Sequence, residues 1–91
     1  MEFFYTYVLK CSDGKLYIGS SSDLKRRISE HLLGGVHSTK NRRPITLLYY
    51  EACRSKKLAE KRERYFKTGF GRAFLHKRLI NTISDIENIP G

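Results

Sequence analysis

Two short segments of strand-forming residues, joined by a turn, begin this sequence and restrict its fold more than any other feature. Residues 3–10 read FFYTYVLK, which is rich in aromatic and β-branched side chains and contains no Gly or Pro. The turn sequence SDG follows at 12–14, and a second strand is expected over 15–19. Strands joined by so short a turn pair antiparallel, so we expect a fold built on an antiparallel sheet.

The middle of the chain predicts one helix and one further strand. Three apolar residues recur at the spacing of a single helical face, which predicts one buried stripe: Leu24, Ile28 and Leu32. The glycine pair at 34–35 would end this helix, and a polar, basic loop is expected at 36–43. A third strand is expected over 45–51.

The C-terminal half predicts two more helices. Ser55 is a suitable cap for the first, and four of its residues are expected on one face: Leu58, Arg62, Tyr65 and Phe66. Gly69 and Gly71 would interrupt this helix, and residues 72–80 predict a short third one. The order β-β-α-β-α-α predicts an α+β fold with a three-stranded antiparallel sheet flanked by helices.

A chain of 91 residues has room for one domain, which we assign to residues 1–83, with a flexible tail expected at 84–91. No apolar run approaches the roughly 18 residues that a membrane span needs, so no membrane partner is expected. Cys11 and Cys53 have no CxxC spacing. This pattern disfavours a disulfide scaffold or a zinc module and favours a reducing, cytoplasmic setting.

Positive charge points to a nucleic-acid partner. The chain has 18 Lys+Arg against 9 Asp+Glu, a formal charge of +9, and the excess lies in two blocks at 24–43 and 54–78. Such a field favours phosphate backbones, because each neutralised phosphate releases counterions. The basic residues that we expect to contact nucleic acid are Lys25, Arg26, Lys40, Arg42, Arg43, Lys67 and Arg72.

Two places combine residues suited to phosphate chemistry, each with an ordinary structural alternative. Arg27 and His31 are four residues apart on the first helix, so one could clamp a phosphate while the other moves a proton. The alternative is a solvated basic helix with an incidental histidine. On the second helix Glu63 could hold a divalent metal, with Glu60 as the rival carboxylate. The alternative is an ordinary ion pair between Glu63 and Lys67.

The ordered set of these motifs resembles the GIY-YIG nuclease family, and most closely its small standalone bacterial members. The resemblance covers roughly residues 3–78, although the first motif lacks its nominal glycine and isoleucine. Arg27 lies ten residues after Tyr17, and His31 fourteen after it, as in the family pattern. The matching segments are YTY at 5–7, YIG at 17–19, DLKRRISEH at 23–31, RP at 43–44, LYYE at 48–51 and AEKRE at 59–63.

The resemblance implies hydrolysis of a DNA phosphodiester bond with one divalent metal ion, Mg²⁺ or Mn²⁺. It implies catalytic roles for five residues: Tyr7, Tyr17, Arg27, His31 and Glu63. Arg27 would stabilise charge on the phosphate, His31 would support a tyrosine or the proton transfer, and Glu63 would bind the metal. One tyrosine would help to activate water; the sequence does not say which, and we favour Tyr17. A tyrosine acts as a base more readily where cations lower its pKa from about 10.

A shared site requires Tyr7 and Tyr17 on the same face of the hairpin. A two-residue loop at 13–14 would place them on opposite faces, because side chains alternate along a strand. We therefore predict an odd-numbered loop at 12–14, with Gly14 in the left-handed conformation.

Three functions remain open at this point. The leading one is a metal-dependent DNA endonuclease directed by DNA shape or structure rather than by sequence. The second is a non-catalytic nucleic-acid-binding module on the same fold. The third is an adaptor that binds a larger repair or processing protein.

Overall fold

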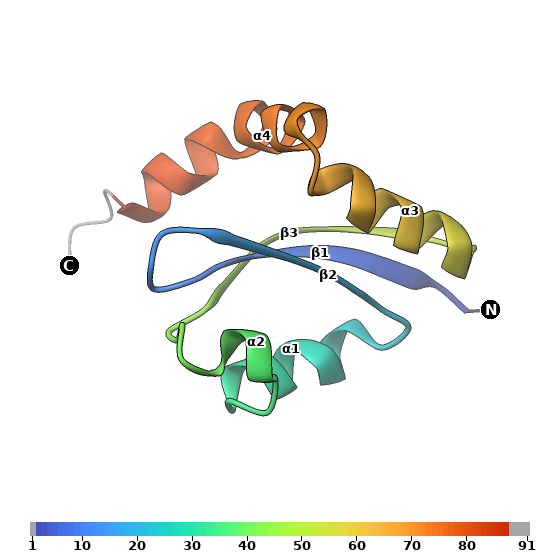
Figure 1. The fold of residues 1–91 in the computed structure, drawn as a ribbon, viewed down its shortest axis with the longest axis horizontal. Helices are drawn as coiled ribbons and strands as arrows, with labels where there is room; N and C mark the ends of the chain where they lie inside the picture. Colours follow the sequence, from blue (N-terminus) through green and yellow to red (C-terminus); the bar gives the residue numbers. More distant parts are fainter. Residues whose placement is uncertain (1, 88–91) are drawn as a thin grey trace.

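A computed structural model describes residues 2–87, with side chains through residue 79. Three strands and four helices follow one another along the chain (Figure 1). The elements are β1 (Phe4–Lys10), β2 (Leu16–Ser21), α1 (Leu24–Leu32), α2 (His37–Lys40), β3 (Thr46–Cys53), α3 (Lys56–Phe66) and α4 (Gly69–Glu87). No helix within residues 2–87 is long and apolar enough to cross a membrane.

The strands form one antiparallel sheet in the order β2-β1-β3, which confirms the predicted α+β fold. Helices α1 and α2 lie over one face of the sheet, and α3 and α4 lie over the other (Figure 1). Each face has its own apolar core. One centres on Tyr7, Leu9 and Ile45, and the other on buried side chains from β1, β2, α3 and α4: Val8, Ile18, Phe66, Leu75 and Leu79.

The β1–β2 turn has the predicted odd-numbered loop. The Cys11 N–H donates to the Lys15 carbonyl at 3.0 Å, which leaves residues 12–14 as the loop. Gly14 adopts φ 78°, a left-handed conformation that a glycine adopts without steric cost. Tyr17 therefore lies opposite Leu9 in the register, so Tyr7 and Tyr17 project from the same face, as predicted.

Helix α1 differs from the prediction in its last turn. The Asp23 carboxylate caps its start by accepting from the Arg26 N–H at 3.1 Å. Leu32 was expected in the buried stripe but is 52% exposed, whereas His31 is 0% exposed. The buried side thus runs through Leu24, Ile28 and His31, because the inner face of an α-helix recurs at a mean of 3.6 residues.

The loop and third helix also differ from the prediction. The segment predicted as a polar loop contains α2, and it buries Val36 and Thr39. Helix α4 begins at Gly69 and continues to Glu87, beyond the expected 72–80, so residues 84–87 of the expected tail are helical. Residues 88–91 lie outside the described part. A Cβ at Gly71 would overlap the backbone of Tyr65, so this glycine lets α4 begin against the end of α3.

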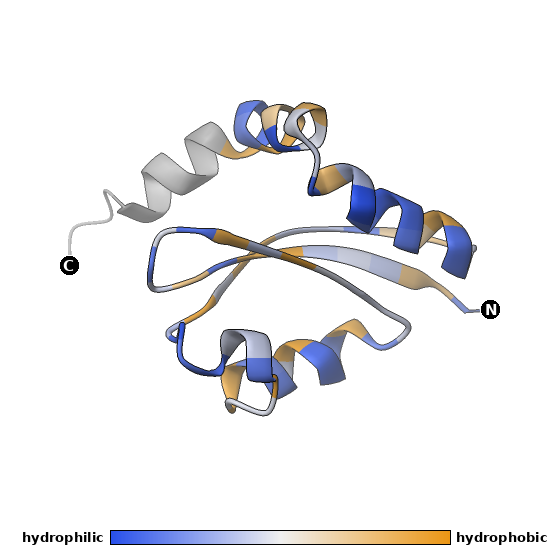
Figure 2. Ribbon diagram, in the orientation of Figure 1, coloured by the Kyte–Doolittle hydropathy of each residue, from blue (hydrophilic) through white to orange (hydrophobic). Residues whose placement is uncertain are grey.

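Helix α3 is hydrophilic along most of its length (Figure 2), and of the four residues expected on one face only Phe66 is fully buried. Leu58 is 58% exposed, and the buried residues of this helix are Ala59 and Phe66. Ala59 and Phe66, seven residues apart, thus lie on the buried side of the helix. Leu58 precedes Ala59 by one residue and therefore points away from that side.

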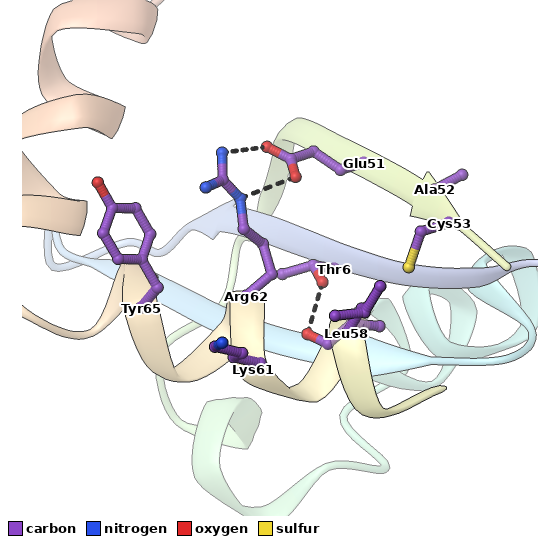
Figure 3. Close-up of a pocket in the computed structure, with 9 residues that line it drawn as sticks. Thr6, Glu51, Ala52, Cys53, Leu58, Lys61, Arg62 and Tyr65 are labelled. Atoms are coloured by element: carbon purple, nitrogen blue, oxygen red, sulfur yellow. Dashed lines mark hydrogen bonds and ion pairs between the residues drawn. The ribbon is translucent and has the colours of Figure 1, made fainter. Parts of the chain in front are cut away.

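A pocket of about 420 Å³ lies between α3 and β3, on the sheet face opposite Tyr7 (Figure 3). Arg62 forms a bidentate ion pair with Glu51 in its wall, with Nε–Oε1 and Nη2–Oε2 distances of 2.9 and 3.0 Å. The same guanidinium lies over the Phe66 and Phe74 rings, 4.5 and 5.0 Å from their centroids. Arg62 thereby joins β3, α3 and α4, which is a structural role.

Candidate active site

A tyrosine and a histidine form a buried hydrogen-bonded pair between the sheet and α1. Tyr7 from β1 is 1% exposed, and His31 from the last turn of α1 is 0% exposed. The Tyr7 hydroxyl lies 2.8 Å from Nε2 of His31. The Tyr17 ring completes the cluster, with its centroid 6.5 Å from that of Tyr7 and 5.1 Å from that of His31. Three of the residues predicted for the site are therefore in contact.

Burial keeps both members of this pair neutral. Desolvation raises the pKa of Tyr7 above its ordinary value, although hydrogen bonding from the Arg27 guanidinium lowers it in part. Arg27 thus acts in the expected direction, but burial outweighs it and the expected lowering does not occur at Tyr7. Desolvation, followed by the positive charge of Arg27, lowers the pKa of His31. At neutral pH a phenol faces an uncharged imidazole.

The second ring nitrogen of His31 contacts a residue that the sequence analysis missed. Nδ1 lies 2.8 Å from the Thr39 hydroxyl, and Thr39 is 0% exposed. The Thr39 hydroxyl in turn donates to the Val36 carbonyl at 3.5 Å. Nothing in the local pattern marks Thr39, because it reaches His31 only through the way in which α2 folds back on α1.

Arg27 lies at the solvent-facing side of this pair. Its side chain is 36% exposed, and its Nη1 lies 3.2 Å from Glu30 Oε1. A guanidinium has five N–H donors in a planar fork, so contacts with Tyr7 and Glu30 leave donors for an incoming anion. Arg27 is thus placed to meet a phosphate at the mouth of the site.

Glu63 reaches the same region from the other face of the sheet. Its Oε1 accepts from the Ser20 hydroxyl at 2.7 Å, and its Oε2 lies 2.9 Å from Lys67 Nζ. Burial alone would raise the pKa of Glu63, but hydrogen bonds from Ser20 and Lys67, with the positive charges of Lys67 and Arg64, lower it overall. The carboxylate is therefore ionised at neutral pH. Its expected rival, Glu60, is exposed.

The β2 edge joins the two halves of the site. Tyr7 pairs with Gly19 in the register, and a Cβ at Gly19 would overlap the Tyr7 hydroxyl and ring. The next residue, Ser20, holds Glu63. Burial is the main cause of the raised pKa of Tyr7, and the negative charge of Glu63 adds a small contribution in the same direction. A side chain at position 19 would displace Tyr7 from this edge.

A comparison with protein-family models shows which family the chain belongs to. Residues 3–77 match the family model described as the GIY-YIG catalytic domain. The chain belongs to the GIY-YIG family. The sequence-based resemblance is confirmed, and the nuclease relationship of the domain follows from it.

Similar GIY-YIG proteins occur in several bacteria. A UPF0213 protein of Streptococcus agalactiae serotype V is 50% identical over 64 residues, which cover 69% of this chain and 73% of the relative. One from Staphylococcus saprophyticus is 45% identical over 86 residues, covering 93% and 99%. The solution NMR structure of a UPF0213 protein from Bacillus halodurans aligns with a TM-score of 0.53 and 33% identity, covering 82% of this chain and 83% of that one.

In this candidate site, Glu63 is the ionised carboxylate that could bind a metal ion. The described residues contain no group of three or more His, Cys, Asp or Glu side chains that could hold one. A Mg²⁺ ion keeps several waters and commonly takes only one or two carboxylates when phosphates supply other ligands. Glu63 fits that requirement. Its Oε1 is oriented by Ser20, and the partner of Oε2 is the exposed amine of Lys67, which can move aside.

Among the basic residues expected to contact nucleic acid, several already have partners. Arg26 lies 3.7 Å from the Asp23 carboxylate, and Arg42 lies 2.9 Å from that of Asp13. The Arg43 side chain donates to the Lys40 carbonyl at 3.0 Å. The expected contacts whose side chains stand exposed are Lys25, Arg26, Lys40, Arg43, Lys67 and Arg72.

Proposed function

We propose that this GIY-YIG domain is a metal-dependent endonuclease that hydrolyses DNA phosphodiester bonds and selects DNA by shape or structure rather than by sequence. One observation carries the proposal: the Tyr7 hydroxyl lies against His31, beside Arg27, and across the Gly19 edge from the ionised Glu63. The Tyr7 hydroxyl therefore has a proton acceptor and a cation as neighbours, and the charge of the candidate metal ligand acts on it. Family membership supports phosphodiester chemistry there.

The Tyr7–His31 pair provides a path for the proton of the attacking water. In this proposal the water gives a proton to the Tyr7 oxygen while the Tyr7 proton moves to Nε2 of His31. The resulting hydroxide attacks phosphorus, the bond to the leaving sugar oxygen breaks, and that oxygen takes a proton from solvent. Tyr7 needs no lowered pKa for this role, because it passes a proton on rather than holding a charge.

Arg27 and Glu63 deal with negative charge in the same step. The Arg27 guanidinium would bind phosphate oxygens as charge develops on them, which is where preorganised donors are most effective. Glu63 would hold Mg²⁺ or Mn²⁺, which when bound supplies Lewis-acid stabilisation of a phosphate oxygen. Tyr17, our choice from the sequence for activating water, contacts His31 and stays a prediction to be tested beside Tyr7.

The basic surface would hold the DNA backbone. Phosphate contacts position a protein without reading sequence, and the chain carries a formal charge of +9 on 91 residues. Selection by DNA shape, or by a larger repair or processing partner, follows from so small a surface. The two cysteines are free thiols, which supports a reducing cytoplasm as the place of action.

A cleavage assay with a matched pair of variants tests the proposal. Wild type, Glu63→Gln and Glu60→Gln are incubated with supercoiled plasmid and labelled branched DNA in Mg²⁺, Mn²⁺ or EDTA. We expect metal-dependent cutting by wild type and Glu60→Gln, and its loss in Glu63→Gln with DNA binding retained. DNA binding without cutting in any metal would instead identify a non-catalytic module. A lack of DNA binding would favour the adaptor.

A further inference from the structure

The hydrogen bonds around His31 allow one consistent arrangement of protons. Burial keeps Tyr7 protonated, so its hydroxyl must donate to an acceptor. Arg27 has only donors, whereas Nε2 of His31 lies 2.8 Å away and can accept. The imidazole is neutral, so its single proton then resides on Nδ1.

The Thr39 hydroxyl oxygen accepts the hydrogen bond from this Nδ1–H group. It lies 2.8 Å from Nδ1, and its own proton points to the Val36 carbonyl at 3.5 Å. Every donor in this series of hydrogen bonds therefore meets an acceptor. The series runs from Tyr7 to His31, from His31 to Thr39 and from Thr39 to the Val36 carbonyl. The reverse arrangement, with the proton on Nε2, would direct two donors at each other unless the Tyr7 hydroxyl turned away.

We infer that Thr39 is a positioning residue, whose hydroxyl holds His31 in the Nδ1–H form so that Nε2 stays open to the Tyr7 proton. The consequence for cleavage rests on the proposed function, but the state of His31 does not. The role of helix α2 is then to hold the Thr39 hydroxyl against His31. Backbone bonds from Thr39 and Lys40 to the Val36 carbonyl, at 3.1 and 2.9 Å, hold the short turn that presents the hydroxyl.

The surroundings of His31 are consistent with a neutral ring whose form is set by its two hydrogen-bond partners, Tyr7 at Nε2 and Thr39 at Nδ1. Arg27 and Glu30 act on it from its own helix with opposite charges, and Tyr7 and Tyr17 contact it from the sheet. The two neutral forms of histidine are close in energy, and the hydrogen bond made by one nitrogen decides which form the other presents.

The first test needs neither a variant nor activity. Two-bond ¹H–¹⁵N correlation spectra of the uniformly ¹⁵N-labelled full chain at pH 7.5 distinguish a protonated ring nitrogen from an unprotonated one. We expect His31 to show a protonated Nδ1 and an unprotonated Nε2. A protonated Nε2, a mixture of the two forms or an imidazolium would overturn the inference.

The second test compares Thr39→Val with Thr39→Ser. Valine keeps the shape of threonine but removes the acceptor of the Nδ1–H group. We therefore expect the Nε2–H form of His31 to appear in Thr39→Val, with the Tyr7 hydroxyl turned away from the ring, whereas serine keeps the hydroxyl and the Nδ1–H form. Unchanged spectra in a folded Thr39→Val would overturn the inference. If valine prevents folding, Thr39→Ala replaces it, and an unchanged Nδ1–H form in that folded variant would equally overturn the inference.

Cleavage kinetics then separate this inference from the proposed function. Where wild type cuts DNA, Thr39→Val should lower kcat about 10- to 100-fold with little change in KM, as removal of a partner behind a functional histidine does, and Thr39→Ser should recover most of the loss. Equal kcat in wild type and Thr39→Val would overturn the positioning role. If wild type never cuts, the proposed function fails while the spectra still decide how Thr39 acts on His31.

Discussion

The Tyr7 hydroxyl occupies the space that a side chain at Gly19 would need. The two residues face each other across β1 and β2, and a Cβ at position 19 would overlap the hydroxyl and the ring. The Tyr7 side chain therefore extends over Gly19 of the β2 strand instead of stopping above its own strand. The glycine of the YIG segment is thus a geometric requirement of the site.

Replacing Gly19 by alanine should displace Tyr7 from His31. Because Tyr7 is 1% exposed and tightly packed, we expect a loss of about 1–3 kcal/mol in unfolding free energy and a large loss of cleavage. Urea unfolding and the cleavage assay measure the two effects. Gly69→Ala is the matched control, since a Cβ there meets nothing within 4 Å. Wild-type behaviour of Gly19→Ala would mean that Tyr7 is not confined as described.

Removing the Ser20 hydroxyl should weaken metal binding at Glu63. Ser20→Ala deletes the 2.7 Å hydrogen bond that orients Oε1, which raises the pKa of Glu63 and loosens the carboxylate. We expect the Mg²⁺ concentration for half-maximal cleavage to rise about tenfold or more. Ser21→Ala, two residues from Gly19, serves as the control. An unchanged Mg²⁺ dependence of cleavage would mean that the Ser20 hydroxyl does not support metal binding at Glu63.

The spacing of residues in the sequence predicts those features of the site that depend on the geometry of a single hairpin or helix. The turn at 12–14 determines the hairpin register, and the register places Tyr7 and Tyr17 on one face. Helical spacing brings Arg27 and His31 to the same site. These relationships depend only on the geometry of one hairpin and one helix, so they could be derived before the structure was known.

Contacts between separate helices and strands could not be predicted from spacing along the sequence. The hydrogen bond from Ser20 to Glu63 joins residues 43 positions apart, and its existence depends on how α3 crosses the sheet. Thr39 reaches His31 because a segment without clear periodicity forms a short helix. Leu32 was expected to be buried but is exposed, because in a short helix the packing of neighbouring elements decides which side is covered.

Acidification below about pH 6.5 should destabilise the protein through His31. The pKa of His31 is lowered in the folded state, first by burial and then by Arg27. As the pH falls through the ordinary histidine value, the unfolded chain takes up a proton that the folded chain does not, and stability falls. Urea unfolding at pH 7.5 and 5.5 measures this change. His31→Gln should reduce the difference between the two pH values; an equal difference in that variant would assign it to other groups.

The variants Arg62→Ala and Lys25→Ala should distinguish a loss of stability from a loss of DNA binding. Arg62 is bound to Glu51 and stacked on Phe66, so Arg62→Ala should lower the unfolding free energy by about 1–2 kcal/mol after allowance for its partial exposure. Lys25 is exposed on α1, so Lys25→Ala should leave stability within about 0.5 kcal/mol of wild type.

The salt dependence of DNA affinity completes the comparison. If Lys25 contacts a phosphate, Lys25→Ala should reduce the slope of log Kd against log salt by about one, because one fewer counterion is released. Arg62→Ala should leave this slope unchanged, since its guanidinium is already engaged by Glu51. Fluorescence anisotropy with a labelled branched DNA across a salt series measures both slopes. If the slope of log Kd against log salt changed in Arg62→Ala and not in Lys25→Ala, DNA would bind the face of the sheet covered by α3 rather than α1.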